Sequence, residues 1–256
     1  GNMIFKELDG GLSVIDNLKV AGAKEGKYGV AVIVSENSDA SAVFTSNKIV
    51  AAPVIYTKKV VEKGKVSAVF VNSGNANCFT GNQGIEDCES LVELVSKELN
   101  IPKGEIAISS TGVIGRKMPL DVITGVASKV FSSLGNKPED SLAAANAIMT
   151  TDKIPKQCAL EVTLTGGTCL LTGEKIAPDY GNLETYETFE ELEAAFKKQI
   201  DYFMDKMLLA CEEVEKAHID LLPSPFLSTK LISPILSKLE SATRAASCHS
   251  FSVRIT

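Results

Sequence analysis

Two glycine-bearing runs in the first half of the chain carry the side chains best suited to holding a ligand. Residues 71–81 read VNSGNANCFTG, and residues 109–115 read SSTGVIG. Small and carboxamide side chains leave the backbone exposed and let it turn sharply. A junction of this composition at the end of a strand can present N–H groups, hydroxyls and carboxamides to a bound molecule.

A tight turn without a ligand has the same composition, and for residues 71–81 alone the two interpretations are evenly balanced. The second run changes that balance, because two such junctions that follow two apolar strands predict one site built from both. Carboxamides offer neither a nucleophile nor a base. We therefore expect those of residues 71–81 to shape and brace a pocket rather than to react.

Apolar strands precede both junctions and must position them. Residues 66–71 and 105–109 are predicted strands, and residues 28–34, nearly all β-branched or small, predict a strand buried on both faces. The same alternation continues with helices predicted at residues 83–99, 120–134 and 141–149 and a half-buried strand at residues 159–165. Strands and helices that interleave in this way predict α/β layers around one core.

The composition is that of an ordinary globular protein. Its 256 residues, 45% hydrophobic and 23% charged, suffice for one large or two modest domains. A formal net charge of −6 without a dense Lys/Arg stripe argues against nucleic-acid binding. No apolar run approaches the roughly 18 residues of a membrane helix, and the N-terminus lacks a signal-peptide core. We expect neither nucleic acid nor a membrane as a partner.

The cysteines and histidines narrow the chemistry further. The six cysteines are scattered and form no C-x-x-C pair, which favours reduced thiols in a cytoplasmic protein over a disulfide frame or a zinc site. The two histidines leave few candidates for imidazole chemistry. The sequence thus predicts a cytoplasmic protein without a metal or other cofactor.

The pattern changes near residues 165–167, where the alternation of strands and helices ends. From Thr188 to about His218, apolar residues recur at steps of three and four, and Thr188 with Glu191 forms a capping box. This predicts one long amphipathic helix that buries its apolar stripe on this domain or on a partner. Residues 229–256 are Ser-rich and predict a poorly ordered tail.

Four runs of the chain, in this order, resemble the ornithine acetyltransferase family, the bifunctional glutamate N-acetyltransferases of arginine synthesis. They are residues 43–54 (VFTSNKIVAAPV), 71–77 (VNSGNAN), 110–115 (STGVIG) and 147–152 (AIMTTD). The resemblance covers about residues 10–165. It implies an α/β fold of two stacked sheets between helical layers, here followed by the long amphipathic helix.

The resemblance also implies a reaction and its residues. Family members are precursors that cut themselves to expose an N-terminal threonine, which carries the acetyl group from N-acetylornithine to glutamate. The oxyanion role implied for Thr111 and Gly112 suits a hydroxyl and a backbone N–H. The implied contact with the small amino-acid substrate falls on Thr151, with Thr150 as the other candidate. An ordinary turn at Thr111 and an ordinary helix-to-strand connection at Thr150 are the structural alternatives.

The chain departs from the family where the nucleophile should stand. The self-cleavage run of the family follows the strand equivalent to residues 159–165, and its nearest trace here is KIAPDYGN at residues 175–182. Asn182 takes the place of the nucleophilic threonine, and Thr185 comes three residues late. No nucleophile can be assigned, so whether the chain is an enzyme stays open. We expect it to be inactive alone, with the missing second half of the family fold or a homo-oligomer as candidate partners.

Residues 168–228 resemble an internal segment of pyruvate formate-lyase-like glycyl radical enzymes. No radical loop accompanies the segment, and Cys211 lies on the apolar stripe, so a structural role is expected. The predicted domains are an acyltransferase-like domain over residues 1–167, this helical segment, and an unplaced tail over residues 229–256. Besides an acyltransferase half, the alternatives are a scaffold that uses the helix of residues 188–218 and a fragment of a glycyl radical acyltransferase.

Overall fold

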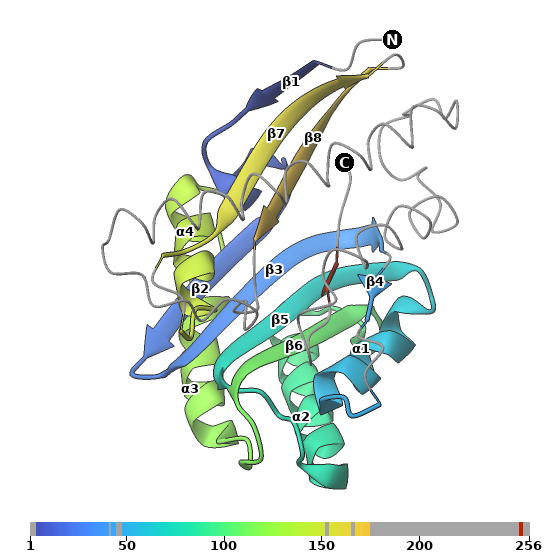
Figure 1. The fold of residues 1–256 in the computed structure, drawn as a ribbon, viewed down its shortest axis with the longest axis vertical. Helices are drawn as coiled ribbons and strands as arrows, with labels where there is room; N and C mark the ends of the chain where they lie inside the picture. Colours follow the sequence, from blue (N-terminus) through green and yellow to red (C-terminus); the bar gives the residue numbers. More distant parts are fainter. Residues whose placement is uncertain are drawn as a thin grey trace.

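The computed structural model of the protein describes residues 4–40, 42–44, 48–151, 154–164, 167–174 and 251–252. The strands are β1 (Ile4–Glu7), β2 (Lys19–Glu25), β3 (Tyr28–Asp39), β4 (Ala42–Val43), β5 (Lys65–Asn75), β6 (Ile106–Val113), β7 (Gln157–Leu164), β8 (Gly167–Glu174) and β9 (Phe251–Ser252). The helices are η1 (Gly11–Val14), α1 (Ala52–Val61), α2 (Gly81–Leu99), η2 (Lys103–Glu105), α3 (Leu120–Phe131) and α4 (Pro138–Ala147) (Figure 1).

The larger sheet has the strand order β2-β3-β5-β6. β3 is antiparallel to both β2 and β5, whereas β5 and β6 are parallel. Parallel neighbours need a crossover connection, and α2 provides it. The carboxyl ends of β5 and β6 therefore lie at the same edge of the sheet, where the two glycine-bearing runs begin.

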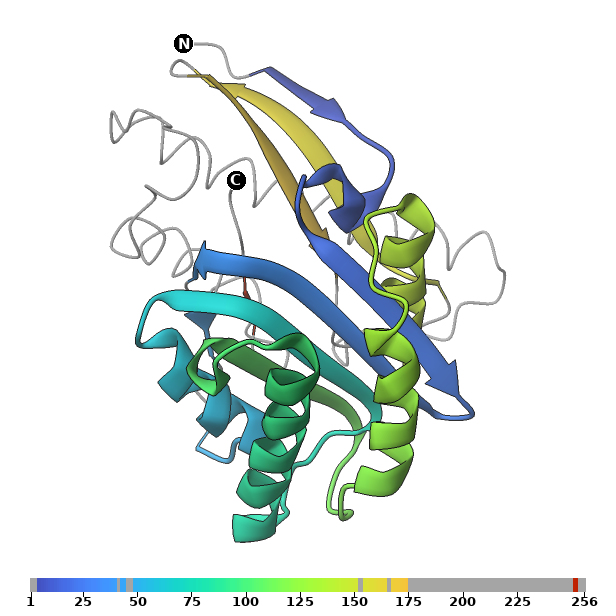
Figure 2. The ribbon, with the colours of Figure 1, turned by 180° about the vertical axis from the view of Figure 1, so that it is seen from behind.

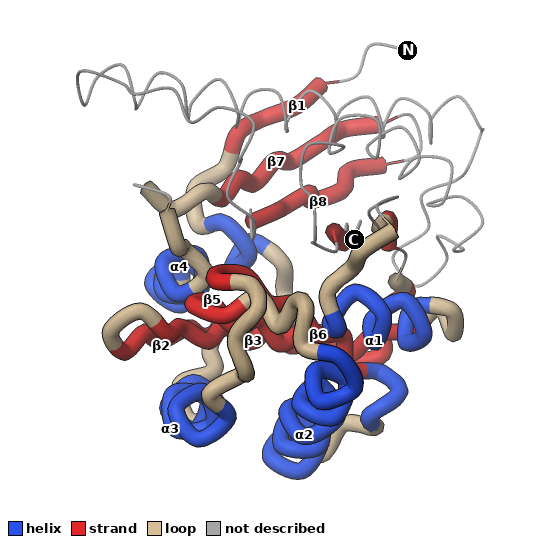
Figure 3. Tube along the Cα trace, turned by 60° about the horizontal axis from the view of Figure 1, so that its bottom comes forward, coloured by secondary structure: helices blue, strands red, loops and turns tan. Residues whose placement is uncertain are grey.

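The helices α2 and α3 cover one face of this sheet, on the side opposite α4 and the smaller sheet (Figure 3). Their apolar residues recur at helical spacing and pack against alternate residues of the strands. The buried residues of this core include Val30, Val32, Ala68, Phe70, Cys88, Leu91, Val92, Val95, Ile106, Ile108, Ile123, Val126, Ala127 and Val130. This core holds the parallel strands β5 and β6 in place from the face that α2 and α3 cover.

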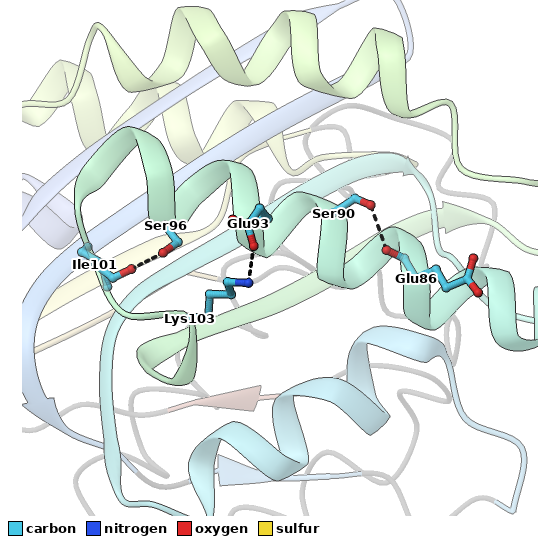
Figure 4. Close-up of polar contacts among 6 residues, drawn as sticks. All are labelled: Glu86, Ser90, Glu93, Ser96, Ile101 and Lys103. Carbon is cyan, nitrogen blue, oxygen red and sulfur yellow. Dashed lines mark hydrogen bonds and ion pairs between the residues drawn. The ribbon is translucent and has the colours of Figure 1, made fainter.

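Helix α2 ends at a left-handed residue, Asn100, with φ of 53°. Asparagine tolerates this conformation better than most side chains. From within α2, the Ser96 hydroxyl donates to the carbonyl of Ile101 at 2.6 Å, and Glu93 forms an exposed ion pair with Lys103 (Figure 4). The chain thus turns back at once into β6.

The other face of the sheet carries α4, which lies along β2 (Figure 2). Ala144, Ala147 and Ile148 pack there against Val20, Ala31 and Val71. The smaller sheet, in the order β1-β7-β8, is antiparallel throughout and lies on the same side as α4. Two sheets with helices are thus present, as expected from the sequence.

Most predicted elements are present, with one informative difference in extent. The strand predicted for residues 66–71 continues to Asn75, so the first five residues of the VNSGNAN run lie inside the sheet. It does so because β3 and β6 pair with it there, Gly29 with Ser73 on one side and Ser73 with Thr111 on the other.

The long helix predicted from Thr188 to His218 lies outside the described residues. Of the predicted tail, only Phe251 and Ser252 are described, as strand β9 beside β4. Across the described ranges, no helix is long and apolar enough to cross a membrane.

Candidate functional site

The two glycine-bearing runs meet where the parallel strands end. In the register of β5 with β6, Ser73 lies opposite Thr111 and Gly74 opposite Gly112. The structure therefore brings together the two junctions that the sequence predicts to share a site.

The glycines at this point allow the two backbones to approach closely. Gly74 has φ of 100° and Gly112 has φ of 131°, a region that side chains with a Cβ rarely adopt. A Cβ on Gly112 would lie 2.5 Å from the carbonyl carbon of Gly74, and one on Gly74 would lie 2.5 Å from the carbonyl oxygen of Lys27. No larger residue fits at either position without moving the backbone.

The carboxamides of the first run are engaged in fixing the loops. The Asn72 amide group donates to the Asn75 carbonyl at 2.9 Å, and its oxygen accepts from the Ser110 hydroxyl at 2.5 Å. The amide group of Asn75 donates to the carbonyls of Arg116 and Lys117, both at 3.1 Å. These bonds tie the loop after β6 to β5, which is the bracing role expected from the chemistry.

Asn77 extends the same bracing to α2. Its amide group donates to the Gly84 carbonyl at 2.9 Å, and its oxygen accepts from the Thr80 hydroxyl at 2.8 Å. Its amide nitrogen also lies 3.4 Å from the Cys88 sulfur. Burial raises the pKa of the Cys88 thiol to about 12. The thiol therefore stays protonated and is unsuited to nucleophilic chemistry.

Three buried side-chain oxygens of the described residues have no hydrogen-bond partner: Asp87 Oδ2, Thr111 Oγ1 and Thr150 Oγ1. A buried polar group without a partner costs about 1–3 kcal/mol. Such a group needs an explanation, and a role in binding or catalysis is one. Two of the three are threonines that the family resemblance implies for the site.

The sheet places Thr111 on the same face as α4. One row of paired residues crosses all four strands: Lys24 with Gly29, Gly29 with Ser73, and Ser73 with Thr111. We call these four residues the transverse row. Paired residues on adjacent strands point to the same face, about 4.7–4.9 Å apart. The hydroxyl of Ser73 donates to the Ala147 carbonyl of α4 at 2.5 Å, which identifies that face.

The segment after α4 carries the other predicted site residues. Thr150 follows Ala147 by three residues and is half-buried, whereas Thr151 is exposed. The ammonium group of Lys24 donates to the Met149 carbonyl, so a second member of the transverse row contacts this segment. The structure thus brings the Thr150 segment onto the face that carries Thr111.

Ser73 and Lys24 are residues that the sequence analysis does not assign to the site. Ser73 lies within the VNSGNAN run, but its strand is predicted to end at Val71. Lys24 belongs to a strand, β2, whose glycine and alanine content gives little β signal. Only the pairing of β2, β3, β5 and β6 places the two residues in line with Thr111. Among the described residues, no group of three or more His, Cys, Asp or Glu side chains could hold a metal ion.

Comparison with known proteins identifies two family matches. The family model described as the ArgJ family matches residues 17–175, and one described as pyruvate formate lyase-like matches residues 150–239. Both resemblances inferred from the sequence are confirmed, and the two matches share residues 150–175.

Curated relatives support the first match. A glutamate N-acetyltransferase of Methanothermobacter thermautotrophicus is 37% identical over 223 residues, which cover 82% of this chain and 56% of that protein. One from Methanocaldococcus jannaschii is 42% identical over 171 residues, which cover 66% of this chain and 42% of that protein. The chain therefore spans about half the length of the curated relatives it matches.

Solved structures agree on the fold. The arginine biosynthesis bifunctional protein ArgJ of Bacillus halodurans has a TM-score of 0.66 at 28% identity, covering 72% of this chain and 99% of that chain. The ornithine acetyltransferase of Mycobacterium tuberculosis, solved in complex with ornithine, has a TM-score of 0.64 at 29% identity, covering 71% and 99%. The arrangement of two sheets and helices is shared with both.

Proposed function

Because the chain belongs to the ArgJ family, we propose that it takes part in the acetyl transfer of arginine biosynthesis, as the half of the site that stabilises the oxyanion and binds the amino-acid substrate. The observation that carries this proposal is the pair of buried, unpartnered hydroxyls of Thr111 and Thr150. The curated relatives, which are glutamate N-acetyltransferases, support the reaction class.

Thr111 and Gly112 are the proposed oxyanion donors. Transfer of an acetyl group passes through a tetrahedral intermediate whose oxygen carries a negative charge. Hydrogen-bond donors that are already fixed where this charge forms lower the activation barrier. The side chain of Thr111 is fully buried, and its hydroxyl makes no bond within the described protein. It can therefore donate to an oxyanion without first giving up another partner.

Thr150 is the proposed contact for the amino-acid substrate. The family resemblance leaves Thr150 and Thr151 as candidates. The burial of the Thr150 oxygen favours Thr150, since Thr151 is exposed and water can satisfy its hydroxyl. The M. tuberculosis relative was solved with ornithine, so L-ornithine is the first ligand to test.

We propose that the chain does not turn over alone. Asn182 stands in the sequence where the family places its nucleophilic threonine, and residues 175–182 otherwise retain only a trace of the motif. A second chain would then supply the nucleophile, either the remaining part of the family fold or another copy. The proposed domains are residues 1–167, 168–228 and 229–256, and the proposed location is the cytoplasm.

Titration of the full chain with L-ornithine tests the binding half of this proposal. We expect saturable binding by calorimetry that Thr150→Val weakens at least tenfold. The control Thr124→Val, on the far face of the sheet in α3, should leave the affinity unchanged. Equal affinities for the two variants, or no saturable binding by the unmodified chain, would contradict the assignment.

Measurement of the intact mass tests the proposal that the chain does not turn over alone. An unprocessed chain has a mass of 27.2 kDa. Processing that exposes Thr185 as a new N-terminus would supply a nucleophile and overturn the proposal that the chain needs a partner.

A scaffold role remains the second candidate function, because the pyruvate formate lyase-like match extends to residue 239. The helix that the sequence predicts over residues 188–218 would then recruit a partner through its apolar stripe. A concentration-dependent increase in mass by sedimentation, abolished by Phe196→Glu and Phe203→Glu, would support this role. A monomer at all concentrations would count against self-association through the stripe.

A further inference from the structure

We propose that Ser73 is a positioning residue: with Lys24, it holds the end of α4 on the transverse row and thereby sets the place of Thr150 relative to Thr111. This inference deepens the proposed function and relies on it for one of its two tests. The other test depends on the folded chain alone.

The backbone of α4 lies directly on β2 and β3 because two glycines leave room for it. A Cβ at Gly22 would lie 2.5 Å from the carbonyl oxygen of Ala143 and from Cα of Ala144. A Cβ at Gly29 would overlap the carbonyl oxygen of Ala147 and lie 2.5 Å from Ser73 Oγ. The space left by Gly29 is therefore the place where the Ser73 hydroxyl meets the helix end.

The last carbonyl of α4 and one carbonyl just beyond the helix receive donors from opposite sides of β3. A helix leaves its last four carbonyls without partners from within the helix. Here Ser73 on β5 donates to Ala147, and Lys24 on β2 donates to Met149. A cation at this end is also favourable to the helix dipole. Two attachments on either side of a strand fix both the translation and the rotation of the segment that follows.

The segment held in this way carries Thr150, one residue after Met149 and three after Ala147. Ser73 is in turn the neighbour of Thr111 in the transverse row. The same side chain therefore contacts the helix that leads to one unpartnered threonine and lies beside the strand position of the other. A displacement of about 1 Å between binding groups can cost two orders of magnitude in rate, so the position of Thr150 is functionally sensitive.

The hydrogen bond from Ser73 to Ala147 would look the same if it served stability alone. The test therefore compares the replacement of two serines of β5. Ser73→Ala removes the donor to Ala147. The matched control is Ser67→Ala, because Ser67 is also a buried residue of β5 and its hydroxyl accepts from Asn37 N–H at 2.8 Å and donates to Glu105 at 3.3 Å. Both variants lose one buried hydroxyl, but only the first lies on the transverse row.

The first measurement is amide hydrogen exchange in the full chain without ligand. The amides of Ile148 and Met149 donate at 3.3 Å to the carbonyls of Ala144 and Asn146. We expect Ser73→Ala to speed their exchange at least tenfold relative to Ser67→Ala. Equal exchange in the two variants would overturn the proposal, whatever the chain binds.

The second measurement is the affinity for L-ornithine. Ser73→Ala should weaken binding about tenfold and Ser67→Ala should not. In a Thr150→Val background the effect of Ser73→Ala should disappear, since coupled residues are not additive. If exchange quickens but affinity is equal in Ser73→Ala and Ser67→Ala, Ser73 is structural and the proposal is wrong. If the unmodified chain binds no ornithine, the proposed function fails, and the exchange measurement still decides whether Ser73 holds the end of α4 in place.

Lys24→Met provides a variant that does not disturb the interior, because Lys24 is exposed. We expect it to quicken the exchange of the Met149 amide and to weaken ornithine binding in the same direction as Ser73→Ala, with Lys24→Arg restoring both. A Lys24→Met chain that matches the unmodified chain in both measurements would contradict the two-point attachment. If Ser73→Ala does not fold, the Lys24→Met measurements alone test the proposal.

Discussion

Replacement of Thr111 by valine should stabilise the free protein while it removes the proposed oxyanion donor. Valine has nearly the shape of threonine and is likewise favoured in strands, so the change replaces the hydroxyl by a methyl group of similar size. The hydroxyl is buried and without a partner in the described protein. Its removal should therefore return the desolvation cost of about 1–3 kcal/mol.

The expected stabilisation can be measured as a shift of the midpoint of thermal unfolding. For a protein of this size, 1 kcal/mol shifts the midpoint by roughly 2–4 °C. Thr111→Val should raise the midpoint by roughly 2–12 °C, measured by circular dichroism. Acetyl transfer, measured once a nucleophile-bearing partner is present, should fall by about 10²–10³-fold in kcat, the usual loss for one oxyanion donor.

Thr57 supplies a control whose replacement by valine should change the thermal midpoint in the opposite direction. It is also a buried threonine, but its hydroxyl donates to the Ile108 carbonyl at 2.6 Å and accepts from the Ile108 N–H at 2.9 Å. Thr57→Val leaves both groups unpaired and should lower the midpoint. If Thr111→Val is as destabilising as Thr57→Val, the Thr111 hydroxyl has a structural partner, and the argument that it waits for an oxyanion fails.

The remaining predictions concern the loops and the pH dependence. Gly112→Ala should destabilise the chain by at least about 2 kcal/mol in urea titration, because φ of 131° and a contact at 2.5 Å both oppose a Cβ; a smaller loss would mean that the two backbones separate easily. Asn77→Ala should cost about 1–3 kcal/mol by the same measurement, since the Gly84 carbonyl loses its donor, and an unchanged midpoint would show that Asn77 does not brace α2. Burial raises the pKa of Glu174 to about 8 from an ordinary value of 4.5, so the folded protein holds this proton where the unfolded chain has lost it. The stability that depends on this proton is complete below about pH 4.5 and is lost as the pH rises to about 8. Glu174→Gln should accordingly match the original chain at pH 4 and exceed its thermal midpoint at pH 8, and equal midpoints at both values would contradict the shift.

Local patterns in the sequence predict the elements around the site because each depends on one short segment. The apolar run before residues 71–81 indicates β5, and the periodicity of residues 83–99 indicates α2, whose observed bounds are Gly81–Leu99. The two glycine-bearing runs could be placed together for the same reason, since each follows a strand and both strands are buried. Nothing comparable marks β2, where Gly22 makes room for α4 and Lys24 bonds to the segment after α4, so the residues of this strand follow no clear strand pattern.

The transverse row could not be read from the sequence, because it depends on register. A shift of one residue in any of the three strand pairs would turn Lys24, Ser73 or Thr111 to the opposite face from its neighbour in the row. β2 and β3 are joined by a turn at residues 26–27, which fixes their register, whereas β5 and β6 are joined only through the crossover helix α2. Lys24, Gly29, Ser73 and Thr111 are separated by up to 87 positions in the chain, yet neighbours in the row lie on adjacent strands.

The position of Thr111 in this row supports the proposal that its unpartnered hydroxyl serves function and does not result from loose packing. Thr111 lies at the end of a row whose other members either contact α4 or make room for it, and its own hydroxyl alone is left without a bond among the described residues of that row. Valine would fit the same strand position and avoid the cost of about 1–3 kcal/mol. A hydroxyl kept at that cost, beside a glycine held at φ of 131°, is what we expect of the proposed oxyanion donor, whose partner charge forms only during reaction. Loss of activity together with a gain in stability in Thr111→Val would be the signature of that arrangement.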